Sequence, residues 1–98
     1  MKKEILVVGT HEHILKVILR LINANELWQA TGCTDATAAL ELVEEKDFDL
    51  VLIGAGLTEE EENLLIKKLK ELQPPRPCVK HYGGGSGLLF AEIYGALN

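Results

Sequence analysis

Four short apolar runs punctuate this chain, and each is followed by a segment in which apolar residues recur at helical spacing. The runs expected to form β-strands are residues 4–9, 27–33, 47–57 and 78–82. The first and third runs are nearly continuous in apolar residues, as in strands that are covered on both faces. Strands and helices that alternate with short links predict an α/β protein with a parallel sheet.

The helical segments carry recognisable start signals. Thr10 is the expected N-cap of a helix over residues 13–24, and Thr34 or Asp35 is the expected start of the second helix. Thr58 and Glu61 have capping-box spacing at the start of the third, which QPPRP ends. A fourth, strongly apolar helix is expected over residues 88–98. The buried stripe of the first helix is expected to consist of Ile14, Leu15, Ile18 and Ile22.

Right-handed crossovers leave few ways to arrange four such units. The strand order 2-1-3-4 places the two most apolar strands in the centre, and helices on both faces complete a flavodoxin-like, three-layer αβα sandwich. Residues 1–98 then form a single domain. Such a sheet opens a crevice at the carboxyl ends of its strands, here between the loops after Gly9 and Gly54.

Composition excludes several classes of function. The net charge of −5 and the scattered lysines argue against binding to nucleic acid. No apolar segment approaches the roughly 18 residues of a membrane span, and the N-terminus does not resemble a signal peptide, so we expect a cytoplasmic protein. Cys33 and Cys78 are expected to be small buried residues with free thiols.

The segments ILVVGTHEHILKVILRLI and DFDLVLIGAGL resemble the receiver (CheY-like) domain of bacterial response regulators over roughly residues 3–73. In that family the first strand ends in an acidic pair that holds Mg²⁺, and the third ends in an aspartate that accepts a phosphoryl group. The resemblance places the acidic pair on Gly9 and Thr10 and the phosphoacceptor on Gly54. Glycine offers neither a nucleophile nor a metal ligand, so the resemblance implies a degenerate receiver without a cofactor.

The end of the chain also departs from the family, in which five strand–helix units are present rather than four. Residues 78–82 resemble either the fourth strand or, through Lys80 and Tyr82, the end of the fifth. In both alignments the last strand forms an edge of the sheet, which favours pairing with another chain. The apolar side chains of the last helix are expected to cover the first helix, within one chain or across a homodimer; they are Leu89, Phe90, Ile93 and Leu97.

Three groups of residues are candidates for function. The loop GGGSG is either an anion-binding loop or a connector, and Trp28 is either a packing residue or a recognition anchor. His11, His13 and His81 are expected at one rim as metal ligands or as solvated side chains, and we expect no native metal. The candidate ligand crevice consists of Gly9, Thr10, His11, Gly54, Gly56, His81, Gly84, Gly85 and Ser86.

No catalytic arrangement is evident. A nucleophile elbow and a carboxylate pair at the strand ends are both missing, and Cys78 and His81 lie three apart on one strand and so face opposite sides. The sequence therefore favours a non-enzymatic, phosphorylation-independent signalling module that acts by self-association or by binding a protein partner. The alternative is a protein that binds a nucleotide or another small anion in the crevice.

Overall fold

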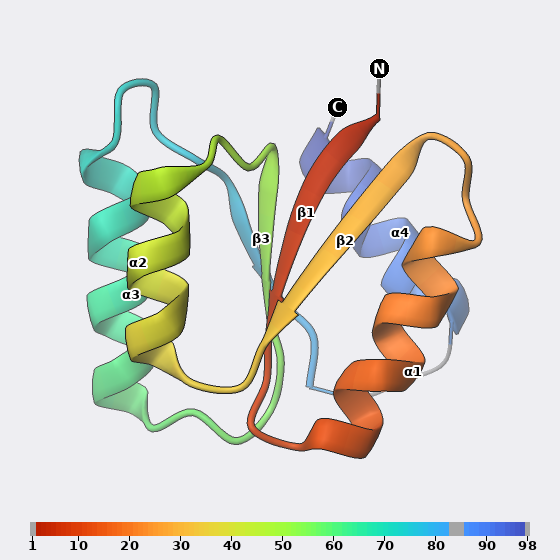
Figure 1. Cartoon of the computed structure of the whole chain (residues 1–98), viewed down its shortest axis with the longest axis horizontal. Helices are drawn as coiled ribbons and strands as arrows, with labels where there is room; N and C mark the ends of the chain where they lie inside the picture. Colours follow the sequence, from red (N-terminus) through yellow and green to blue (C-terminus); the bar gives the residue numbers. More distant parts are fainter. Residues whose placement is uncertain (1, 83–85, 98) are drawn as a thin grey trace.

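The computed structural model describes residues 2–82 and 86–97 of the chain. Strands and helices alternate along it as expected (Figure 1). The elements are β1 (Lys3–Val8), α1 (Glu12–Asn23), β2 (Trp28–Cys33), α2 (Ala36–Glu45), β3 (Leu50–Ile53), α3 (Glu59–Glu71), β4 (Cys78–Lys80) and α4 (Ser86–Leu97).

The strands form a parallel sheet of order β2-β1-β3-β4, which confirms the predicted topology. Ile5 pairs with Leu50 and Val8 with Ile53, so β1 and β3 run side by side in the centre. β4 pairs with β3 and forms one edge of the described sheet, and β2 forms the other. Because all strands point the same way, their carboxyl ends share one edge of the sheet, at the bottom of Figure 1.

Helices cover both faces of the sheet: α1 and α4 lie on one side, and α2 and α3 on the other (Figure 1). Successive residues of β1 alternate between the two sides. Ile5 and Val7 belong to the core beneath α1 and α4, whereas Leu6 and Val8 belong to the core beneath α2 and α3. This double burial explains why β1 is continuously apolar from Ile5 to Val8.

The structure confirms two of the three expected helix starts. Asp35 caps α2, where its side chain accepts a hydrogen bond from the Ala38 amide at 2.7 Å. Thr58 and Glu61 form the reciprocal capping box of α3. The assignment of Thr10 as the cap of α1 is wrong, because the helix begins at Glu12 and its N-cap is His11, which makes no side-chain capping bond.

The expected stripe of α1 is correct at Leu15, Ile18 and Ile22, which are buried, but not at Ile14. Ile14 is 49% exposed. It lies near the carboxyl-end edge, where α1 borders a cavity described below rather than packed side chains. Helical spacing therefore identified the correct buried face of α1, but the predicted buried stripe wrongly included Ile14.

The apolar side of α4 packs against α1 and the sheet within the same chain, as in the first of the two expected arrangements. Leu89 and Ile93 are fully buried, and Phe90 and Leu97 are partly buried against the same core. Trp28 is 2% exposed, and its ring centroid lies 4.9 Å from that of Tyr94 and 6.0 Å from that of Phe90. Trp28 is thus a packing residue of the β2–α4 contact.

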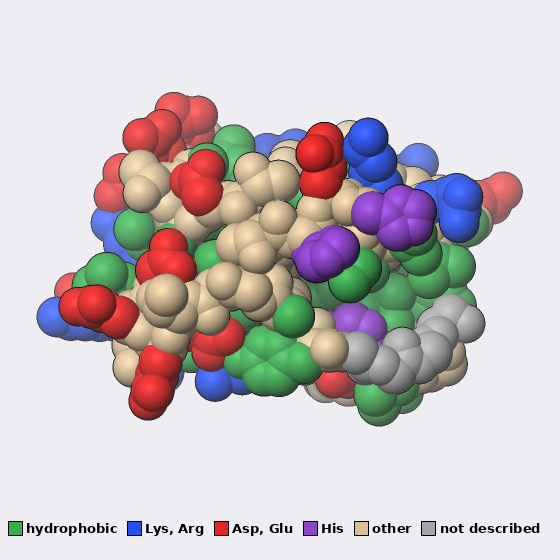
Figure 2. All heavy atoms as spheres, turned by 90° about the horizontal axis from the view of Figure 1, so that it is seen from below, with side chains coloured by type: hydrophobic (Ala, Val, Ile, Leu, Met, Phe, Trp, Pro, Cys, Tyr) green, Lys and Arg blue, Asp and Glu red, His purple; other side chains and the backbone are tan. Residues whose placement is uncertain are grey.

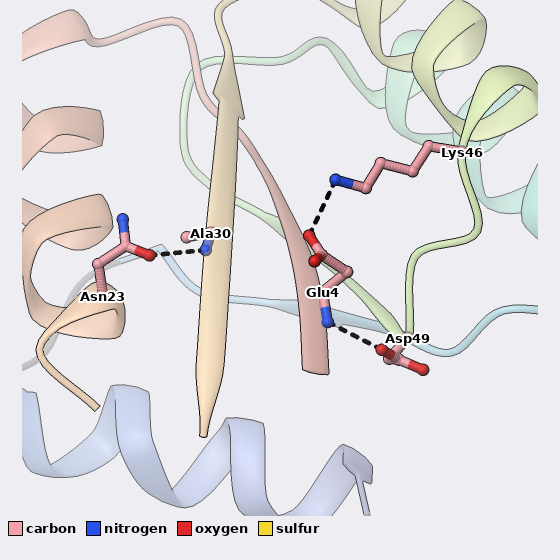
Figure 3. A network of polar contacts seen from close by, with 5 residues as sticks. All are labelled: Glu4, Asn23, Ala30, Lys46 and Asp49. Carbon is pink, nitrogen blue, oxygen red and sulfur yellow. Dashed lines mark hydrogen bonds and ion pairs between the residues drawn. The ribbon is translucent and has the colours of Figure 1, made fainter. Parts of the chain in front are cut away.

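Polar contacts fix the amino ends of the central strands (Figure 3). The Glu4 amide donates to Asp49 Oδ2 at 2.8 Å, and the Asp49 amide donates to the Glu4 carbonyl at 2.8 Å. Lys46 Nζ lies 3.0 Å from Glu4 Oε1. These contacts of Asp49 therefore help to set the register of β3 against β1, at the end of the sheet opposite the candidate crevice.

Within residues 2–82 and 86–97, the helices are too short or too polar to span a membrane.

Candidate functional site

Two glycines meet where the central strands end. The register that pairs Val8 with Ile53 brings Gly9 and Gly54 next to each other, and both are buried. The Gly54 amide donates to the Val8 carbonyl at 2.7 Å, and the Gly9 amide donates to the Cys33 carbonyl at 3.1 Å. A Cβ atom at Gly54 would lie only 3.1 Å from the Val8 carbonyl oxygen. The centre of this edge therefore consists of closely packed backbone rather than functional side chains.

The loops that follow β1 and β3 close against each other through Thr10 and Gly56. Gly56 has φ of +105°, a backbone conformation that side-chain-bearing residues rarely adopt. The Thr10 side chain occupies the space that a Cβ atom at Gly56 would need. These two predicted crevice residues thus contact each other and do not line the cavity beside them.

The cavity lies between α1 and α4 and has a volume of about 230 Å³. Figure 2 shows the carboxyl-end edge of the molecule, where acidic side chains gather over the α2–α3 half and histidines surround an apolar hollow in the other half. Of the predicted crevice residues, Gly9, His11, Gly54 and His81 line it. Gly84 and Gly85 lie outside the described residues, as does the side chain of Ser86.

His81 connects the edge strand to α4. Its amide donates to the Ile53 carbonyl at 2.8 Å, which extends the pairing of β4 by one residue. Its side chain is 6% exposed, and Nδ1 lies 2.5 Å from Glu92 Oε1 on α4. The residue pattern did not indicate this pair, because helical spacing does not show whether Glu92 lies beside the end of β4. Strand alternation alone had predicted that Cys78 and His81 face opposite sides, and Cys78 does pack beneath α2 and α3.

Lys80 and Tyr82, on either side of His81, both reach Glu62 on α3. The Tyr82 hydroxyl donates to Glu62 Oε2 at 2.6 Å, and Lys80 Nζ lies 3.2 Å from Glu62 Oε1. The hydrogen bond from Tyr82, together with the contact to Lys80, lowers the pKa of Glu62. The hydrogen bond to Glu62 in turn raises the pKa of Tyr82, and the contact with Glu62 raises the pKa of Lys80. The Lys80 amine is therefore engaged by a carboxylate on α3.

Neither cysteine resembles a reactive nucleophile. Burial, followed by the charge of Asp35, raises the pKa of the Cys33 thiol to about 11. Burial also raises the pKa of Cys78. Both thiols are free and are protonated at neutral pH. Within the described ranges, no group of three or more His, Cys, Asp and Glu side chains is arranged to hold a metal ion.

Comparison of the sequence with family models and with curated proteins gave no match. Comparison of the fold with solved structures gave strong matches. The signal receiver domain of an HD domain-containing protein from Pseudomonas fluorescens Pf-5 has 25% sequence identity and a TM-score of 0.72, with 99% of this chain and 77% of that chain covered.

Two further matches are more distant in sequence. The receiver domain of the hybrid histidine kinase CckA has 17% identity and a TM-score of 0.75, with 97% of this chain and 99% of that chain covered. The orphan response regulator HP1043 of H. pylori has 14% identity and a TM-score of 0.64, with 98% of this chain and 97% of that chain covered. The chain is therefore receiver-like: it has the fold of response regulator receiver (CheY-like) domains, built from four strand–helix units around a sheet of order 2-1-3-4.

Proposed function

We propose that this chain is a receiver-like signalling module that functions without phosphorylation, by association with a second copy of itself. The observation that carries the proposal is the pair of buried glycines, Gly9 and Gly54, at the ends of the central strands. Phosphoryl transfer needs a carboxylate nucleophile and a bound cation at such a site. The nearest acidic residue before β3, Asp49, is bound to Glu4 at the opposite end of the sheet.

The surface proposed for association is the outward face of α4. It consists of the exposed residues Gly87, Leu88, Ala91, Tyr94 and Gly95, which form one stripe along the helix. Leu88 is 51% exposed and Tyr94 48% exposed. The one charged residue of α4, Glu92, is bound to His81.

The absence of charged side chains from this stripe favours a second copy of the chain as its binding partner. In a two-fold symmetric dimer a surface patch meets itself, so a charged stripe would place like charges in contact. The α4 stripe avoids that repulsion, whereas the chain as a whole carries a net charge of −5. Glycine and alanine allow two helices to approach closely. The edge strand β4 lies beside α4 and extends the proposed contact surface.

We expect the protein to elute as a dimer, with twice the mass of one chain, in size-exclusion chromatography with light scattering. Leu88→Glu and Ala91→Glu place a charge in the stripe and should each weaken association at least tenfold, which corresponds to about 1.4 kcal/mol. Leu64→Glu is the matched control, because Leu64 is a 55% exposed leucine on α3. A monomer at millimolar concentration, or equal disruption by the control, would contradict the proposal.

Small phosphodonors are expected to leave the mass of the intact protein unchanged. Incubation with acetyl phosphate and Mg²⁺, followed by mass spectrometry of the undigested chain, measures this directly. A receiver domain that retains its phosphoacceptor aspartate serves as the positive control. Stoichiometric addition of one phosphoryl group to this chain would show that a residue other than Gly54 has taken over the acceptor role.

The alternative function, binding of a nucleotide or another small anion, has less support from the geometry. The cavity of about 230 Å³ is smaller than the roughly 300–1,000 Å³ of typical pockets for drug-sized ligands, and apolar side chains form most of its wall. A smaller and less polar ligand fits it better.

A further inference from the structure

The cavity between α1 and α4 has an apolar floor. α1 packs on β1 and β2 and α4 on β3 and β4, so the two helices leave a gap above β1 near its carboxyl end. Val7, Leu15, Ile18 and Leu89 form the floor of that gap. A protein cavity of about 150 Å³ lined by apolar side chains holds benzene, so about 230 Å³ accommodates a ring with small substituents.

Few polar side chains line the cavity in the described part of the chain. His11, His13 and His81 all line it, together with Tyr82, and the lining within the described part of the chain includes no carboxylate, lysine or arginine. An ionised ligand would therefore be buried without a permanently charged partner, at considerable cost. A neutral ligand with one polar group fits this lining better.

His81 is the polar group whose orientation is fixed. The Glu92 carboxylate, 2.5 Å from Nδ1, accepts a hydrogen bond, so the neutral ring carries its proton on Nδ1. The other ring nitrogen, Nε2, is then a lone-pair acceptor, and it has no hydrogen-bond partner among residues 2–82 and 86–97. Because the His81 side chain is 94% buried and lines the cavity, this acceptor is available to a bound molecule.

We propose that the cavity binds a small neutral molecule with an apolar body and one hydroxyl group, such as a phenol, whose O–H donates a hydrogen bond to Nε2 of His81. The ring would rest on the floor residues beneath α1 and α4. This site is separate from the outward stripe of α4, since Leu89 faces the cavity and Leu88 faces solvent. The proposal therefore goes beyond the proposed association and stands independently of it.

The test compares two probes of similar shape under identical buffer conditions. Phenol donates a hydrogen bond, whereas its methyl ether, anisole, can only accept one. In NMR titrations of the ¹³C-methyl-labelled protein, we expect phenol to bind with a Kd of about 0.1–1 mM. We expect anisole to bind about fivefold to tenfold more weakly, because Nε2 then lacks a donor. The largest shifts should fall on the methyl groups of Val7, Leu15, Ile18 and Leu89.

Variants identify the anchoring group. His81→Leu should reduce phenol affinity about tenfold and abolish the preference over anisole, whereas Asn63→Leu, on the exposed face of α3 away from the cavity, should leave both unchanged. Anisole that binds the wild-type protein as tightly as phenol would overturn the proposal, as would an absence of binding at about 10 mM phenol. The comparison of the two probes in the wild-type protein needs no variant, so it remains decisive if His81→Leu fails to fold.

Discussion

Replacing Phe48 with alanine is expected to lower the free energy of unfolding by about 3–5 kcal/mol. Phe48 precedes β3, is 1% exposed, and packs in the core beneath α2 and α3. Removal of the ring leaves a cavity that the surrounding strand and helix residues cannot fill without moving. Because small domains are stable by only about 5–15 kcal/mol, the urea midpoint measured by circular dichroism should fall by about 2 M.

The matched control for Phe48 is Phe90→Ala on α4. Phe90 is only partly buried, at the edge of the other core, so the same chemical change removes less contact and should cost clearly less. An equal or larger loss at Phe90 would indicate that the core beneath α1 and α4 dominates the stability of the domain, contrary to this expectation.

Gly56→Ala is expected to destabilise the protein by about 2 kcal/mol, although Gly56 is exposed and lies in a loop. The residue has φ of +105°, and a Cβ atom there would collide with the Thr10 side chain. Urea unfolding monitored by the fluorescence of Trp28 measures the loss.

Two further variants separate the causes of that loss. In a Thr10→Ala background the collision is reduced and the backbone strain stays, so Gly56→Ala should cost less there but not become neutral. Gly95→Ala lies on the exposed face of α4, where no neighbouring group of the described residues outside the helix backbone lies within 4 Å of the new Cβ, so it should instead stabilise the helix by about 0.5–1 kcal/mol. If Gly56→Ala were neutral, the close contact between the loops after β1 and β3 would be excluded.

The sheet could be predicted because short segments of the sequence are enough to identify its strands. The two central strands are continuously apolar over residues 5–8 and 50–53, and short links between alternating strands and helices permit few right-handed arrangements. The capping box of Thr58 and Glu61 is equally local, since both residues lie within one turn. The cap of α1 was assigned wrongly because the Thr10 side chain instead contacts Gly56, in a loop more than forty residues away in the sequence.

The candidate site depended on more than the sequence pattern. Gly9 and Gly54 lie together as predicted, because strand register alone brings them together. The predicted crevice, however, included Thr10 and Gly56, which close against each other, while the open space lies toward α1 and α4. The floor residues Val7, Leu15, Ile18 and Leu89 were recognisable as core residues, but nothing in their spacing indicated a gap between the helices that carry them.

By itself, the sequence determined the order of the strands, the two-sided burial of β1 and β3, and the presence of glycine directly after each of these two strands. These features follow from hydrophobic periodicity and from residue identity, which act over a few neighbouring positions. Only the tertiary structure decided that α4 covers α1 within the same chain, that His81 contacts Glu92 while Lys80 and Tyr82 contact Glu62, and that a cavity remains between the helices. Those features depend on the separation and angle of packed elements, which are set by the fit of many distant side chains at once.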